Sequence, residues 1–333
     1  MASWRFLADA PAVSGLSFRG FRGSEDYPVM VELLNAACAA DGIERFVTLE
    51  DMRLQYEHLD NSDPSTDVVI AEIDGRPVAY GRVLWWEENQ GPIRYSPFCF
   101  VHPDGRGKGI GTAMLAHNEA LLRRVAAGHD PGRERTLRVD HADTEAAAAA
   151  LYEQAGYRPV EFHATLVRPD LEDIPEAPMP AGLIVRTPAE DEMRKVWDAE
   201  AEAFRDHVGA SDPTENDFEQ FLASPWRDPT LWRIAWDGDQ VAGGVRSYIN
   251  EDENAQFGRK RGWTEDISVR RPYRRRGLAR ALLVQSLHAV KERGMEEAAL
   301  GVHTGNPNGA FDLYQSVGFR VTQMWTELHK PLD

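Results

Sequence analysis

The sequence predicts an α/β protein in which two similar domains follow one another along the chain. The length of 333 residues exceeds the size at which one hydrophobic core usually keeps growing. Short segments recur at a nearly constant distance, and strand-like and helix-like patterns alternate in the same order in both halves. These observations together predict two copies of one α/β fold.

The repeat is visible as pairs of similar segments separated by 162 to 168 residues. The pairs are GLSFR at 15–19 with GLIVR at 182–186, DGRPVA at 74–79 with DGDQVA at 237–242, Val101 with Val269, and ALYEQAGY at 150–157 with DLYQSVGF at 312–319. One duplicated unit with loop insertions would produce this spacing. We therefore expect an N-terminal domain at 1–168 and a C-terminal domain at 182–333. The linker at 169–181 is too rich in proline to form a helix or a central strand.

Each domain is expected to contain a strand, helical segments, three strands, a long helix, a strand, a short helix and a final strand. In the second domain the expected elements are a strand at 183–186, a helix at 189–204, a hairpin of 231–236 and 240–249 around the DGD turn, and strands at 262–269 and 297–303. The long helix of each domain has apolar residues on one face. They are Ile110, Met114, Leu115, Leu121, Leu122 and Val125 in the first, and Leu278, Leu282, Leu283, Leu287 and Val290 in the second.

Composition and charge exclude several classes of protein. The formal net charge of −17 argues against a nucleic-acid partner and favours cationic or neutral substrates. No apolar run approaches the ~20 residues of a membrane span, and the N-terminus does not resemble a secretion signal. Cys38 and Cys99 form no disulfide framework, which suits a reducing cytoplasm. There is no HExxH motif and no Cys/His cluster, so we expect no metal. A monomer or homodimer is expected.

One segment departs from the acidic balance of the chain. Between 259 and 276 lie eight Lys or Arg residues against only Glu265 and Asp266. This stretch is either a solvated basic loop or a place where an anionic ligand binds. RNA binding through Arg270 and Arg271 stays an alternative despite the overall charge.

A glycine-rich loop lies between a strand and the long helix in each domain. It reads VHPDGRGKGIG at 101–111 and VRRPYRRRGLA at 269–279. In both copies an arginine follows the valine by five residues and begins the pattern Arg, two residues, Gly, one residue, then Gly or Ala. A helix N-terminus has N–H groups without partners, and glycine lets the backbone approach a phosphate closely. Each loop is therefore expected to bind an anion.

Two common phosphate-binding loops do not fit this spacing. A Walker A loop needs GK followed by Ser or Thr, but Lys108 is followed by Gly109, and the second copy lacks the pattern. A dinucleotide fingerprint needs GxGxxG or a final Ala, whereas Thr112 or Met114 stands at its last position. Neither class explains both copies.

The pattern shared by both loops resembles the acyl-CoA pyrophosphate loop of the GNAT N-acetyltransferase superfamily. TGNPNGAFDLYQSVGF at 304–319 is similar to the family's downstream segment of Asn, a short helix with Leu-Tyr, and Gly-Phe. The resemblance covers nearly the whole chain, and the duplication is similar to that of mycothiol synthase-like members. It implies two tandem GNAT domains, each with a mixed, mostly antiparallel sheet that is splayed between strands 4 and 5 and flanked by helices.

The resemblance also implies acetyl-CoA as cosubstrate, bound in the splay of the sheet, and an amine of a small molecule as acceptor. The residues that it assigns to the cofactor in the second domain are Ile267, Ser268, Val269, Arg274, Arg275, Arg276, Gly277, Leu278, Ala279 and Asn306. Those in the first domain are Phe100, Val101, Arg106, Gly107, Lys108, Gly109, Ile110 and Gly111. A non-catalytic acetyl-CoA sensor is the alternative function.

Acetyl transfer to an amine needs a proton acceptor for the ammonium group and a proton donor for the departing thiolate. Glu265 lies on the strand that borders the thioester and is the candidate base; otherwise it pairs with a surface arginine. Tyr314 falls on the family's tyrosine position, where a phenol can protonate a thiolate; otherwise it packs beside Phe319. Asp266 points to the opposite face and is the weaker candidate.

The first domain departs from this pattern and is expected to bind the cofactor with weak or no catalysis. Pro97 stands where the second domain has Glu265, and Thr144 stands in place of Asn306. Tyr152 and the glycine loop are retained.

The segment FRDHVG at 204–209 lies in a region that borders the acceptor pocket in the family. Asp206 is a candidate for binding an ammonium group and His207 for acid-base chemistry; alternatively, Asp206 is a solvated residue at the end of a helix. The identity of the amine does not follow from the sequence.

Overall fold

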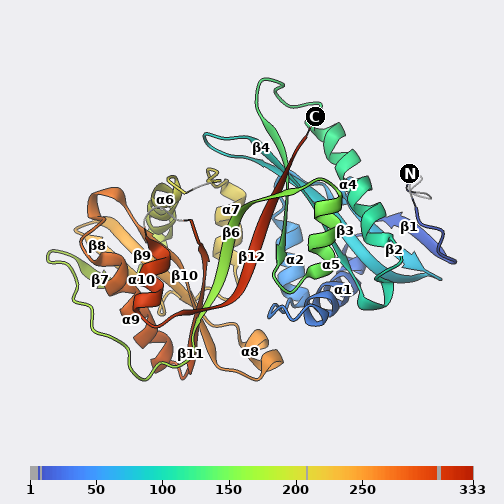
Figure 1. Ribbon diagram of the computed structural model, residues 1–333. Coiled ribbons are helices and arrows are strands. Elements are labelled where there is room, and N and C mark those ends of the chain that lie inside the picture. Colours follow the sequence, from blue (N-terminus) through green and yellow to red (C-terminus); the bar gives the residue numbers. More distant parts are fainter. Residues whose placement is uncertain (1–6, 8–9, 208, 306–308, 333) are drawn as a thin grey trace. The chain divides into compact units, whose positions relative to one another are not determined.

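The structure is a computed structural model, and it describes residue 7 and residues 10–207, 209–305 and 309–332. The chain divides into two compact units, 1–160 with 326–333 and 161–325. Both units consist of neighbouring strands with helices packed on them (Figure 1). This confirms the predicted α/β fold with two similar domains.

In the first unit the strands are neighbours in the order β1, β2, β3, β4, β5 and β12. Their bounds are β1 (Leu16–Gly20), β2 (Val68–Ile73), β3 (Arg76–Glu87), β4 (Ile93–Val101), β5 (Arg135–Ala142) and β12 (Arg320–Pro331). The helices of this unit are α1 (Tyr27–Ala40), α2 (Leu49–Glu57), α3 (Pro64–Asp67), α4 (Ile110–Ala126) and α5 (Ala146–Gln154).

The second unit repeats this order, because its strands are neighbours in the order β7, β8, β9, β10, β11 and β6. Their bounds are β6 (Arg158–Arg168), β7 (Ile184–Arg186), β8 (Arg233–Asp237), β9 (Gln240–Tyr248), β10 (Arg261–Val269) and β11 (Glu297–His303). The helices are α6 (Met193–Phe204), α7 (Glu215–Ala223), α8 (Glu251–Phe257), α9 (Leu278–Glu292) and α10 (Ala310–Ser316). Helix α8 was not expected from the sequence; the Asn250 side chain accepts a hydrogen bond from the Glu253 N–H at its start.

Local signals explain why corresponding helices begin where they do. Helix α2 follows Thr48 and α7 follows Thr214, and each threonine forms a capping box with an aspartate three residues later. The long helices α4 and α9 bury the predicted apolar stripe: Ile110 and Met114 in α4, and Leu282 and Leu287 in α9, are at most 1% exposed. The duplicated sequence therefore specifies duplicated helix starts and duplicated core faces.

The sheet opens between the fourth and fifth strands of each unit. Strands β4 and β5 pair in parallel only at 93–95 with 135–137, and β10 and β11 only at 261–263 with 297–299. The ladders β1–β2, β2–β3, β3–β4, β7–β8, β8–β9, β9–β10 and β6–β11 are antiparallel. The parallel strands thus separate after three residues, which confirms the predicted splay.

The last strand of each predicted domain contributes to the other compact unit. Residues 163–168 of β6 pair with β11 within the second unit. Residues from Thr326 onward belong to the first unit, where β12 is the neighbour of β5 and the Leu332 N–H donates to the Arg135 carbonyl. The compact units therefore differ in their bounds from the predicted domains at 1–168 and 182–333. No helix or strand lies between Arg168 and Ile184, in the segment predicted as a linker.

Within the part of the chain that the structure describes, no helix is long and apolar enough to cross a membrane.

Candidate active site

The arginine that opens the repeated loop pattern holds the loop in place through three contacts. In the second unit the Nε of Arg274 donates to the carbonyl of Val269, 2.9 Å away, five residues earlier. One terminal nitrogen donates to the carbonyl of Ala203 in α6 at 3.0 Å, and the other lies 2.7 Å from Oδ2 of Asp206. The guanidinium therefore ties the loop to the strand before it and to the end of α6.

Arg106 makes the same three contacts in the first unit. Its Nε donates to the carbonyl of Val101 at 3.2 Å, and its terminal nitrogens bind the carbonyl of Ala37 and the carboxylate of Asp41. These three contacts form the arginine brace of each loop. The bond from the arginine side chain to the valine carbonyl explains the five-residue spacing from valine to arginine.

Asp206 belongs to this brace. Its carboxylate binds the guanidinium groups of Arg271 and Arg274, which hold the pKa of Asp206 well below its usual range. Asp41 is the counterpart of Asp206 in the first unit. Of the two residues expected to bind substrate, His207 lies in the wall of the cavity described below, whereas Asp206 is not among the described residues that line it.

The turn into each long helix uses left-handed backbone conformations. Gly109 and Gly277 precede α4 and α9 with φ of 78° and 84°. Two residues earlier, φ is 71° at Gly107 but 59° at Arg275, a conformation that disfavours a side chain. The first helical bond of α9 runs from the Ala281 N–H to the Gly277 carbonyl. The N–H groups of 278–280 precede that bond and have no intrahelical acceptor.

A cavity of about 810 Å³ lies at this loop in the second unit. Its wall is formed by the loop, by the end of β10, by β11 and by α10. The predicted residues among those lining it are His207, Glu265, Ile267, Ser268, Val269, Arg274, Arg275, Gly277, Leu278, Ala279 and Tyr314. The fold thus brings most of the predicted second-domain residues to one cavity; Asn306 lies outside the described residues.

Glu265 spans the opening between β10 and β11. A bulge interrupts the pairing of β10 with β9 between Glu265 and Ser268, and Asp266 within it has a φ of 51°. The Gly301 N–H of β11 donates to Oε1 of Glu265 at 2.9 Å. Burial raises the pKa of Glu265 to about 8, the charge of Asp266 acts in the same direction, and the bond from Gly301 opposes them.

Tyr314 reaches the same cavity from α10. Its side chain is buried, and its ring meets that of Phe319 edge to face with centroids 6.4 Å apart. Burial, together with the charge of Glu265, raises the pKa of this phenol. Tyr314 therefore packs beside Phe319, which is one of the two interpretations of the sequence. It also borders the cavity, and its raised pKa keeps the hydroxyl group protonated.

A cluster of three charged residues lies at the bulge, with Glu200 buried and Asp266 partly exposed. Arg246 of β9 binds both carboxylate oxygens of Glu200 at 2.7 and 2.8 Å and the carboxylate of Asp266 at 2.7 Å. Burial, and then the charge of Asp266, raises the pKa of Glu200 to about 7 although Arg246 lowers it. This cluster was not predicted, because the three residues come from different elements and form no local motif.

Strand β4, the counterpart of β10, has neither the bulge nor the carboxylate. Strands β3 and β4 pair without a register shift, and Arg82 lies opposite Phe98 where Arg246 lies opposite Glu265. The counterpart of Glu265 is therefore Phe98 and not Pro97, because the extra residue of the bulge displaces the alignment by one. The Arg82 guanidinium is buried 5.2 Å from the centre of the Phe98 ring.

The loop of the first unit, which includes Lys108 and Gly111, also differs from its counterpart in its surroundings. A Cβ placed on Gly109 would lie 3.2 Å from the Cβ of Pro11, whereas a Cβ on Gly277 would meet nothing within 4 Å. Pro11 thus lies against the turn into α4.

Family models match both halves of the chain. The model described as "Acetyltransferase (GNAT) family" matches residues 193–319, and that of an "Acetyltransferase (GNAT) domain" matches residues 64–159. A mycothiol acetyltransferase of Frankia casuarinae is 30% identical, over 92% of this chain and 95% of that protein. The chain belongs to the GNAT acetyltransferase family. A mycothiol acetyltransferase of Geodermatophilus obscurus is 28% identical, over 87% of this chain and 89% of its own.

Solved GNAT structures show the same fold over nearly the whole chain. A GCN5-related N-acetyltransferase from Sphaerobacter thermophilus has a TM-score of 0.73 and 26% identity, with 96% of each chain covered. A tandem GNAT protein from the clavulanic acid pathway has a TM-score of 0.66 at 18% identity, over 96% of this chain and 99% of that chain. GNAT acetyltransferases use acetyl-CoA, and this chain is a tandem member of the family.

Proposed function

We propose that the second unit of this tandem GNAT protein transfers the acetyl group of acetyl-CoA to a primary amine of a small molecule. The amine attacks the thioester directly while both substrates are bound. Glu265 serves as the base, Tyr314 as the acid, and the loop from Arg274 to Ala279 as the pyrophosphate site. The first unit is proposed to bind the cofactor weakly or not at all and to lack catalysis.

The residues present fit acetyl-CoA. A Cβ at Gly277 would point into open space, the first N–H groups of α9 have no intrahelical acceptor, and the adjacent cavity is about 810 Å³. The separation of β10 from β11 leaves the edge of 267–269 next to this cavity, where an extended pantetheine chain can pair with backbone groups. Acetyl-CoA would supply the thioester carbonyl carbon.

Glu265 is suited to take a proton from the incoming ammonium group. A carboxylate with a pKa of about 8 holds a proton strongly enough to accept it near neutral pH and still ionises there. The bond from Gly301 holds its Oε1 against β11. The neutral amine then forms the new C–N bond.

Tyr314 is suited to the other proton transfer. As the C–S bond breaks, the electron pair leaves with the sulfur, and the phenol can protonate the departing thiolate. Its raised pKa keeps the hydroxyl protonated at working pH. The products are an amide and the free thiol of CoA. The proton taken by Glu265 returns to solvent, and the second proton lost by the amine nitrogen restores the Tyr314 hydroxyl group.

The observation that carries the proposal is that one cavity contains the Glu265 carboxylate, the Tyr314 side chain and the N-terminal turn of α9. The test is steady-state release of the CoA thiol with a panel of amines that includes the acceptor of the mycothiol acetyltransferases. Glu265→Gln and Tyr314→Phe should each lower kcat by ~10²- to 10⁴-fold, the usual cost of losing general acid or base catalysis. Both variants should keep their affinity for acetyl-CoA.

Tyr152→Phe is the matched control, because Tyr152 occupies the corresponding place in the first unit, where Phe98 replaces the carboxylate. It should change kcat by no more than a few fold. If Tyr152→Phe abolished turnover and Tyr314→Phe left it intact, the assignment of catalysis to the second unit would be wrong.

A further inference from the structure

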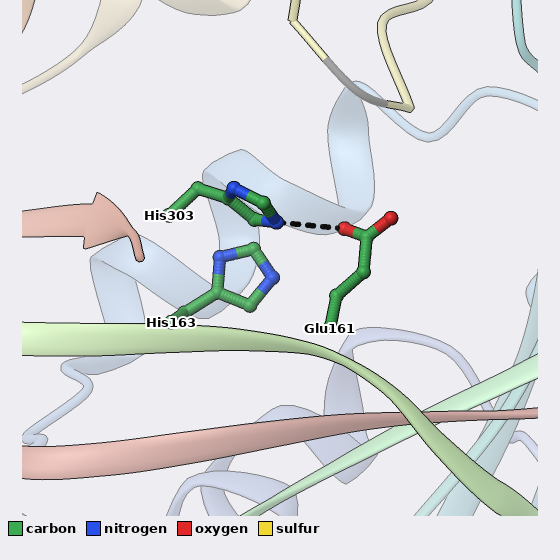
Figure 2. A group of neighbouring side chains, drawn as sticks. All are labelled: Glu161, His163 and His303. Carbon is green, nitrogen blue, oxygen red and sulfur yellow. Dashed lines mark hydrogen bonds and ion pairs between the residues drawn. The ribbon is translucent and has the colours of Figure 1, made fainter. Parts of the chain in front are cut away.

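Two histidines and a glutamate of the second unit lie together on neighbouring strands. His163 of β6 is paired with His303 of β11 in the antiparallel ladder, so the two side chains project from the same face. Glu161 precedes His163 by two residues and therefore shares that face. Figure 2 shows the two imidazole rings and the carboxylate converging. The strand pairing thus brings together three metal-binding side chains that are far apart in sequence.

The distances within this group are those of a small polar cluster. One ligand atom from each residue can be chosen so that all three lie within 4.8 Å of one another. His303 Nε2 is 3.0 Å from Oε2 of Glu161, and the ring centroids of His163 and His303 are 5.0 Å apart. Donor atoms around a tetrahedral ion at ~2.0–2.1 Å lie ~3.4 Å apart. Small side-chain rotations would therefore suffice to close the group around an ion.

The surroundings of the group favour an ion that is reached from the cavity. Both histidines line the cavity that contains Glu265 and Tyr314. The side chains of His303 and Glu161 are 23% and 17% exposed, so the group is partly shielded from solvent. Within the described residues, the salt bridge of Glu161 is to His303 and not to a lysine or arginine. The negative charge of Glu161 is therefore not already neutralised by a permanent cation.

We propose that Glu161, His163 and His303 bind a divalent transition-metal ion of the zinc type. Two imidazole nitrogens and one carboxylate oxygen form a His₂Glu donor set, which leaves a fourth coordination position open. That position faces the cavity, where it provides a docking point for a Lewis-basic group of the acceptor. The sequence led us to expect no metal, because the proposed ligands at residues 161, 163 and 303 form no sequence motif.

Metal binding can be measured without acetyl-CoA or acceptor, so its outcome is independent of the proposed acetyl transfer. Untagged protein is stripped with a chelator and titrated with Zn²⁺ by calorimetry and with Co²⁺ by visible absorption. One ion per chain is expected, and Co²⁺ should give the intense bands of a low-symmetry, four-coordinate site. His163→Gln and His303→Gln should each lower the affinity for Zn²⁺ by more than ~10–100-fold, which is the usual effect of removing a residue that only hydrogen-bonds to a metal ligand.

His329→Gln is the matched control. His329 is also hydrogen-bonded to a glutamate, with its Nε2 2.6 Å from Oε1 of Glu327, but this pair is not part of a three-ligand group among the described residues. Its removal should leave Zn²⁺ affinity unchanged, and circular dichroism should show that all three variants are folded. Failure of the wild-type protein to bind either ion overturns the proposal, as does binding that persists in the His163→Gln, His303→Gln double variant. The group is then a cross-strand ion pair only.

Discussion

At the scale of single residues, the two glycine loops differ at the position two residues before the glycine that precedes the long helix. The first loop has Gly107 there, whereas the second has Arg275 at a φ of 59°. A residue other than glycine in the left-handed region destabilises the folded protein by ~1–2 kcal/mol. A glycine there avoids this cost, but part of the gain is lost because glycine gives the unfolded chain more conformational entropy. An arginine at such a position suggests that its side chain has a use at the cavity that it lines.

We expect Arg275→Gly to raise the free energy of unfolding by up to ~1 kcal/mol. The same change should weaken acetyl-CoA binding several-fold, because a cation beside the phosphates is lost. Urea unfolding and calorimetric titration check the two effects. Arg276→Gly is the control, since residue 276 is not among the positive-φ positions, and it should be neutral or destabilising. Equal stability changes in the two variants would contradict the strain at Arg275.

The raised pKa of Glu265 predicts a pH-dependent stability effect. The unfolded carboxyl ionises near pH 4.5, whereas the folded one stays protonated up to about pH 8. Between these values the unfolded state releases the proton first, so a rise in pH lowers the free energy of unfolding of the wild type. Glu265→Gln should therefore be increasingly more stable than the wild type from pH 5 to 8, and the difference should level off above pH 8. Urea unfolding of both proteins at a series of pH values checks this. If the pKa of Glu265 were normal, the difference in their free energies of unfolding would not change between pH 5 and 8.

At the scale of elements, the bulge of β10 distinguishes the second unit from the first, in which the corresponding strand β4 pairs regularly. It turns Glu265 toward β11 and places the Asp266 carboxylate on Arg246. In the first unit the regular pairing of β3 with β4 leaves Phe98 at this place. The two units therefore differ here in two ways, by the bulge of β10 and by a carboxylate in the place of a phenylalanine side chain.

Asp266→Asn tests the electrostatic part of this arrangement. Asparagine tolerates a left-handed backbone, so the bulge should persist while the negative charge is removed. Because that charge raises the pKa of Glu265, the acidic limb of the pH profile of kcat/KM should move to lower pH. Glu265→Gln should lose this limb altogether. A profile that is unchanged in Asp266→Asn would show that the limb belongs to another group.

The sequence predicted those elements whose signals are local. The apolar stripes of α4 and α9, the glycine loops and the family's Leu-Tyr segment are each contained in one short stretch, and each was placed correctly. The arginine brace, the Arg246 cluster and the group at 161, 163 and 303 were missed. Their members meet only through strand pairing and helix packing, and no short-range pattern encodes those contacts. The mistaken alignment of Pro97 has the same origin, because a bulge is defined by the partner strand.

At the scale of the whole molecule, the duplicated loops need not be equivalent binding sites. Pro11 lies against Gly109, whereas the space beside Gly277 is open. We expect calorimetry to find one tight acetyl-CoA site per chain and at most one weaker site. Gly277→Asp should abolish the tight site, because a carboxylate would enter the turn proposed to bind the pyrophosphate, and Gly109→Asp should leave it unchanged. Loss of tight binding in Gly109→Asp alone would place the principal site in the first unit.

The strand exchange between the two halves has a consequence for how the chain matures on the ribosome. Strand β5 has β12 as its neighbour, and the part of β12 that belongs to the first unit begins at Thr326, after the entire second unit. The first unit therefore cannot complete its sheet until the residues that follow the whole second unit have been made, and β5 is left with an open edge until then. The second unit, in contrast, receives β6 before its other strands have emerged. Although the first unit comes earlier in the gene, the second unit is the one that can finish folding first.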